Sequence, residues 1–147
     1  MNTEVVRVTA AGMPRTTFEQ AVTYLADVLR ECQLILVDGV DSPHTSQLDV
    51  VALAQVLIPD LEEVRDLFRE ADVTSAEERV TMDFALHASK AATMVHLQMH
   101  LVQLRFVEVE GGILVASDPE VIDLLRWIWD EASEQLHGRP PRPYHHA

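Results

Sequence analysis

The sequence has one cysteine among its 147 residues, so no disulfide can form within the chain. Cys32 lies at the end of an apolar helical pattern, which predicts a buried structural thiol. The start of the chain lacks a basic segment followed by an apolar one, and the longest apolar stretch is interrupted by Asp83 and Lys90. We therefore expect neither a signal peptide nor a membrane span, and a cytoplasmic location.

Basic residues are also scarce. There are 11 against 24 acidic ones, which gives a formal net charge of -13, and they are scattered along the sequence. Binding to a nucleic-acid backbone needs a positive patch, so we expect no nucleic-acid partner. Lysine and asparagine each occur once, whereas arginine occurs ten times. This bias indicates a GC-rich, bacterial coding sequence.

The motifs of the common enzyme classes are missing as well. The sequence contains no glycine-rich phosphate loop, no cysteine and histidine spacing of a zinc site, no Gly-x-Ser-x-Gly elbow and no dinucleotide fingerprint. We therefore predict no cofactor, and the sequence leaves open whether the protein is an enzyme.

What the chain does have is enough apolar residues, 48%, for one core. We expect a single α+β domain at residues 1–138 and a tail with prolines and histidines at residues 139–147. Residues 4–9 and 34–37 are expected to be strands, paired in parallel through a helix at residues 16–32. A second polar and apolar alternation around two glycines predicts a hairpin at residues 106–116.

The remaining apolar patterns have helical spacing. They predict helices at residues 48–58, where Pro59 would end the helix, at 61–70 and at 118–137. Ser75 and Glu78 have the spacing of a capping box, which predicts a long helix from residue 75 to about residue 104. The expected fold is thus a small mixed sheet, made of the N-terminal strands and the hairpin, covered by about five helices with the long one at its centre.

The predicted long helix carries a neutral polar stripe within its apolar surroundings. The stripe consists of Ser89, Thr93, His96, His100 and Gln103, at steps of four and three residues. Residues at this spacing share one helix face, so they are candidate ligand-binding residues in a pocket. The alternatives are a polar seam between packed elements, or core histidines that form hydrogen bonds to neighbouring elements. Asp83 and His87, another pair four residues apart, are interpreted as structural.

His96 and His100 are also candidates for catalysis, together with Asp38, Asp41 and His44 of the loop that follows the expected second strand. Ordinary turn chemistry explains this loop equally well, because Asp-Gly and Ser-Pro favour turns. Two histidines one turn apart could contact a transition metal, but two ligands do not make a site, and we predict no metal.

Trp127 and Trp129 lie about 200° apart on the expected last helix, so one should face the core and the other the expected hairpin, a partner or solvent. Both are candidate interface residues. The leading functional hypothesis is a small accessory or regulatory protein that acts through protein contacts, as a homodimer or in a complex with another protein. The alternative is a small-molecule binding protein or cofactor-independent enzyme that uses the polar stripe. The acidic residues Glu108 and Glu110 of the expected hairpin argue against a DNA-binding wing.

Overall fold

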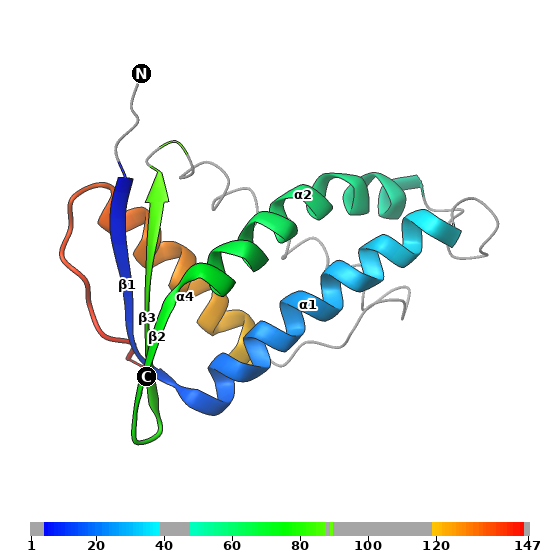
Figure 1. Ribbon diagram of the computed structural model, residues 1–147. Coiled ribbons are helices and arrows are strands. Elements are labelled where there is room, and N and C mark those ends of the chain that lie inside the picture. The colour runs from blue at the N-terminus through cyan, green and yellow to red at the C-terminus, as the bar shows by residue number, and fades with distance from the viewer. Residues whose placement is uncertain (1–4, 39–47, 88, 90–118, 146–147) are drawn as a thin grey trace.

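The computed structural model describes residues 5–38, 48–87, 89 and 119–145. In chain order its elements are β1 (Val5–Pro14), α1 (Arg15–Asp38), α2 (Leu48–Glu70), β2 (Asp72–Ala76), β3 (Arg79–His87) and α4 (Pro119–Leu136). Three strands and three helices in this part of the chain confirm an α+β fold (Figure 1). The prediction of about five helices is not supported.

The three strands form one antiparallel sheet in the order β1-β3-β2. β3 is central, and its buried and less buried residues alternate along the strand, as expected for a strand with one face against a core. β1 has an irregularity between Ala10 and Met13, where Gly12 has a φ of 72°. Glycine adopts this conformation without steric cost, so it suits the irregular point of the strand.

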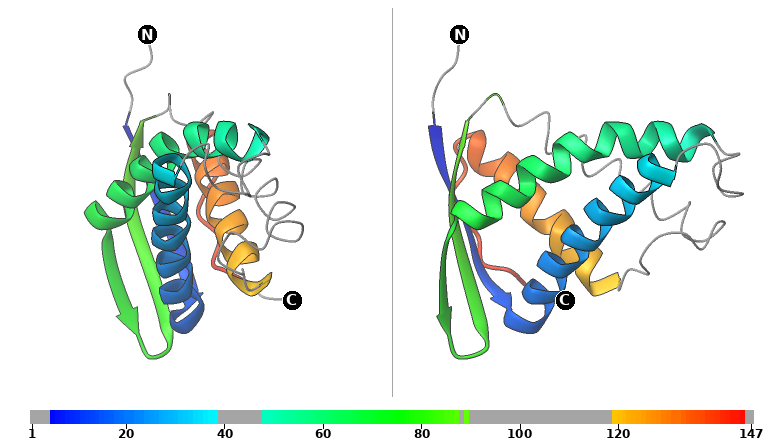
Figure 2. Two further views of the ribbon diagram at one scale, coloured as in Figure 1. Left: turned by 90° about the vertical axis from the view of Figure 1, so that its right-hand side faces the viewer. Right: turned by 45° about the vertical axis from the view of Figure 1, so that its right-hand side comes forward.

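The core lies between the inner face of this sheet and the three helices. The sheet contributes Val8, Ala10, Met13, Val80, Met82, Phe84 and Leu86. α4 packs against β1 and α1, and α1 packs against α2. Figure 2 shows α1 and α2 as an antiparallel pair that projects away from the sheet. The base of α1 follows β1 and contacts β1 and β3, whereas the end of α2 contacts β3 and leads into β2.

The outer edge of β1 is closed by α4 and by the tail, which runs beside the strand (Figure 1). The Gln135 side-chain amide accepts a hydrogen bond from the Thr9 backbone N–H and donates one to the Thr9 carbonyl, both at 2.8 Å. The backbone N–H of Tyr144 donates to the Ala11 carbonyl at 2.8 Å. These contacts satisfy backbone groups that an edge strand otherwise leaves free.

A buried carboxylate fastens the tail to α4. Glu131 is 1% exposed, and its two oxygens accept hydrogen bonds from the backbone N–H and the guanidinium of Arg142 at 3.0 to 3.3 Å. The Nε2 of Gln135 also donates to Glu131, at 3.3 Å. α4 ends as predicted before Gly138, whose φ is 88°. One polar network thus joins β1, α4 and the tail.

Several expected elements are wrong. Residues 34–37 belong to α1 and form no strand, so the predicted parallel pair does not exist. α2 continues through Pro59, where two helices were expected. The expected helix from residue 75 is not formed up to residue 87, because residues 72–76 and 79–87 are strands. The expected hairpin at 106–116 lies outside the described residues. Within the described residues, no helix has the length and apolar character that crossing a bilayer requires.

Candidate interaction site

The C-terminal half of α2 contributes charged residues to two hollows. Leu57, Leu61 and Val64 recur at helical spacing and are buried. Arg65 and Arg69, four residues apart, share one flank, and each borders a groove towards α1. The other flank carries Glu63, Asp66 and Glu70, at steps of three and four, and faces β3. A hollow lies along each flank, and the two hollows differ in charge.

The first hollow is an open apolar groove of about 360 Å³ between α1, α2 and β2, here called the Arg-lipped groove. It is lined by Phe18, Val22, Leu25, Ala26, Arg65, Phe68, Arg69 and Val73. Val22 is 39% and Val73 is 47% exposed, which is high for valines that lie next to a core. The groove therefore leaves apolar surface in contact with water.

The floor of the groove is aromatic. Phe18 and Phe68 stack with their ring centroids 6.2 Å apart and their planes at 7°. Phe68 in turn meets the ring of Trp129 edge-on at 6.3 Å. Trp129 is 2% exposed, so its ring belongs to the core and lies directly behind the floor. A molecule that contacts Phe68 will thus alter the surroundings of Trp129.

The described residues that line the groove carry only positive charge. The charged ones among them are the two arginines, in a chain that has more than twice as many acidic as basic residues. Arg65 makes a long 3.4 Å contact with Asp66, its neighbour in sequence, and within the described residues Arg69 has no ion-pair partner. An exposed pair of this kind contributes little to stability, so both guanidinium groups are available to a carboxylate.

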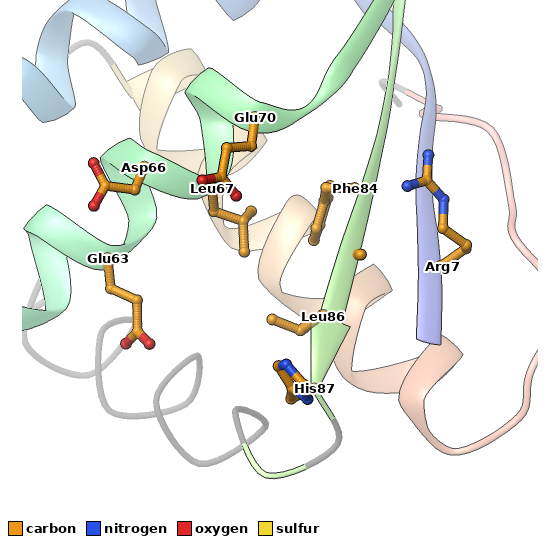
Figure 3. Close-up of a pocket in the computed structure, with 9 residues that line it drawn as sticks. Arg7, Glu63, Asp66, Leu67, Glu70, Phe84, Leu86 and His87 are labelled. Carbon is orange, nitrogen blue, oxygen red and sulfur yellow. The ribbon is translucent and has the colours of Figure 1, made fainter. Parts of the chain in front are cut away.

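The second hollow, of about 280 Å³, lies between α2 and β3 (Figure 3). Leu67, Phe84 and Leu86 point into it, and the three acidic residues of α2 surround it together with Arg7 and His87. Arg7 contacts Asp72 at 3.4 Å across the exposed face of the sheet. The lining has both signs of charge. Within the described part of the chain, no group of three or more histidine, cysteine, aspartate or glutamate side chains could hold a metal ion.

Most of the predicted site residues are not described by the structure. Thr93, His96, His100 and Gln103 of the polar stripe lie outside the described residues, as do Asp41 and His44. Ser89 is described and exposed, two residues after the end of β3, and Asp38 is the last residue of α1. Asp83 and His87 do not form a helical pair, because both lie on β3. The Asp83 carboxylate instead accepts a hydrogen bond from the Thr9 hydroxyl at 2.5 Å.

The two tryptophans point in different directions, as their spacing predicts. Trp129 is buried, so its ring is not available as an exposed contact. Trp127 is partly buried and meets the Tyr144 ring edge-on, with centroids 5.0 Å apart. The outward tryptophan therefore packs on the chain's own tail.

The residues of the Arg-lipped groove were not singled out from the sequence. The spacing of Arg65 and Arg69 was visible there, but it resembles an ordinary solvated helix face. The two arginines border a groove because Val73 of β2 lies beside them, and the sequence predicts no strand there, since Val73 falls between the expected helices at residues 61–70 and 75–104.

Comparisons with protein-family models, with curated proteins and with solved structures found no match to this chain. Any function assigned to the chain therefore rests on the arrangement of its own residues.

Proposed function

We propose that the protein is a small accessory or regulatory protein that acts by binding a segment of another protein in the Arg-lipped groove. The observation that carries this proposal is the exposure of Val22 and Val73 over an aromatic floor. Each apolar Å² removed from water contributes roughly 25 cal/mol, so covering this surface favours association. Apolar grooves with a polar rim are typical of protein interaction sites.

The charge of the rim favours a partner with acidic residues beside apolar ones. Complementary charge speeds association and excludes wrong partners. A second copy of the chain has the same groove and a net negative surface, so a homodimer through this site is one form of the proposal. A different protein is the other form.

Selection from a random twelve-residue peptide library displayed on phage tests the proposal. We expect the wild-type protein to enrich peptides that do not bind the Val22→Asp variant, because a carboxylate in the groove must be desolvated when a peptide covers it. Val56→Asp is the matched control. Val56 is a 51% exposed valine outside the groove, so this variant should bind the same peptides as the wild type.

Three outcomes contradict the proposal or replace it. Enrichment of the same peptides by the Val22→Asp variant would place binding elsewhere, and no enrichment by any variant would refute a peptide site. If decanoate, an apolar carboxylate, instead binds the wild type stoichiometrically and no peptide competes with it, the small-molecule function takes the place of the protein-binding one.

A further inference from the structure

We infer that the partner segment binds as an extended strand along the free edge of β2, with alternate apolar side chains in the Arg-lipped groove and a carboxylate at Arg69. This inference rests on the proposed function, and it specifies the conformation and the chemistry of the segment.

The free edge of β2 is the first observation. Among the described strands, β2 pairs with β3 alone and on one side, and all five of its residues are exposed. Exposed edge strands usually contain lysine, proline or a bulge that prevents further pairing. β2 has none of the three, and its ladder with β3 is regular from Asp72 to Ala76. β1, the other edge, is occupied at Thr9 by Gln135 and at Ala11 by the tail. Among the described residues, the β2 edge is thus the one that is free along its whole length.

The direction of Val73 is the second observation. Val73 pairs with Met82, whose side chain is fully buried on the inner face of the sheet. Paired residues on neighbouring strands point to the same face, so Val73 also points inward, and there it lines the groove. The helices leave it 47% exposed. A strand added beside β2 would therefore direct every second side chain towards the groove.

The size and charge of the groove indicate which side chains the partner segment should have. A volume of about 360 Å³ is near the lower end of the range for ligand pockets, roughly 300 to 1,000 Å³. This matches a few apolar side chains better than the long stripe of an amphipathic helix. Arg69 lies four residues before Val73, at the end of the groove where α2 leads into β2. An aspartate or glutamate next to the apolar positions would meet its guanidinium.

The test uses a synthetic copy of the most enriched peptide from the phage selection. We expect its sequence to alternate apolar and polar residues and to contain an acidic residue. Binding is followed by fluorescence of the Trp127→Phe variant, in which the only remaining tryptophan is Trp129, behind the groove. We expect amide hydrogen exchange within residues 72–76, measured by NMR, to slow by at least tenfold at the amides that face the added strand.

Two control comparisons separate strand addition from other binding modes. A peptide with N-methyl groups on the amides that would pair with β2 should lose binding, while methylation of the alternate amides should not. Arg69→Glu should weaken binding about tenfold, equivalent to 1.4 kcal/mol. Arg126→Glu, the same charge change on an exposed residue of α4, should bind as the wild type does.

If the peptide binds but β2 exchange is unchanged, or if both methylated peptides bind equally, strand addition is refuted and the proposed protein-binding function survives. Equal effects of Arg69→Glu and Arg126→Glu would refute the role of Arg69. If the selection yields no groove-dependent peptide, the proposed function and this inference are both overturned.

Discussion

At the residue scale, Cys32 shows how burial sets the chemistry of a side chain. Its thiol is 1% exposed in α1. Burial, with a smaller contribution from the neighbouring Glu31 carboxylate, raises the pKa of the thiol to about 11 from an ordinary 9.0. Since the thiolate is the reactive form, Cys32 is inert in the folded protein at neutral pH.

This shift predicts a pH dependence of stability. Between pH 9 and 11 the unfolded thiol loses its proton while the folded thiol keeps it, so the folded state binds more protons. The contribution of Cys32 to the free energy of unfolding is therefore constant below about pH 9 and falls as the pH rises towards 11. Urea denaturation of the wild type and of Cys32→Ala at several pH values measures it.

The difference in unfolding free energy between these two proteins should shrink from pH 9 to pH 11. Other groups that titrate in this range, such as tyrosines, cancel in the comparison. A constant difference would contradict a raised pKa, as would rapid alkylation of the native thiol at pH 8.

At the candidate site, the orientation of some residues can be predicted from the sequence, whereas the exposure of others depends on the fold. Trp127 and Trp129 could be assigned opposite directions from sequence, because helical geometry fixes their relative orientation. Val73 could not be recognised, because its exposure depends on the order of the strands and on the position of α1 against them. The spacing of residues along the chain can be read from the sequence, but the contacts between distant segments cannot.

At the element scale, helices with a strong apolar stripe were predictable and the sheet was only partly so. α1 and α4 carry periodic apolar residues. The predicted position of α4 is confirmed, and α1 begins as predicted but continues past residue 32 to Asp38. β3 was expected to be helical because Ser75 and Glu78 imitate a capping box. Its alternation of Val80, Met82, Phe84 and Leu86 is a strand pattern, and pairing with β1, more than 60 residues away, stabilises it. The run at 34–37 was ambiguous because it is too short to show a period.

Pro59 provides a test at this scale. It lies inside α2 with an exposed side chain, and proline in a helix interior costs about 3 kcal/mol relative to alanine. Proline also restricts the unfolded chain, which offsets up to about 1 kcal/mol. We expect Pro59→Ala to raise the free energy of unfolding by about 2 to 3 kcal/mol, measured by urea denaturation.

The control for this prediction is Gln55→Ala, which changes another exposed residue of the same helix. It should alter the free energy of unfolding by less than about 0.5 kcal/mol. A loss of stability in Pro59→Ala would mean that the chain breaks at Pro59, as the sequence alone suggested.

At the scale of the whole molecule, the tail is part of the folded structure. Tyr144 packs on Trp127 and bonds to β1, and Arg142 neutralises the buried Glu131. Deleting residues 139–147 should lower the free energy of unfolding by about 3 kcal/mol, because a buried carboxylate is left without its cation. The Arg142 side chain is 70% exposed, so solvent screening places this value at the low end for a buried pair.

A double-mutant cycle separates the ion pair from the other tail contacts. The same deletion in a Glu131→Gln background should cost about 1 to 2 kcal/mol less, since no buried charge is stranded there. Equal losses in both backgrounds would mean that the tail is held by Tyr144 and its backbone contacts alone.

The amide of Gln135 has a consequence for assembly. Because it occupies the backbone groups of Thr9, the described sheet is blocked at this point of β1 and can lengthen past β2. A protein that can extend its sheet at both edges can polymerise without limit, as fibres do. Because β2 is the edge of the described sheet that is free along its length, two copies that pair through β2 use up this edge in both, and growth stops at the pair. The side chain of one glutamine thus favours a pair of copies over a fibre.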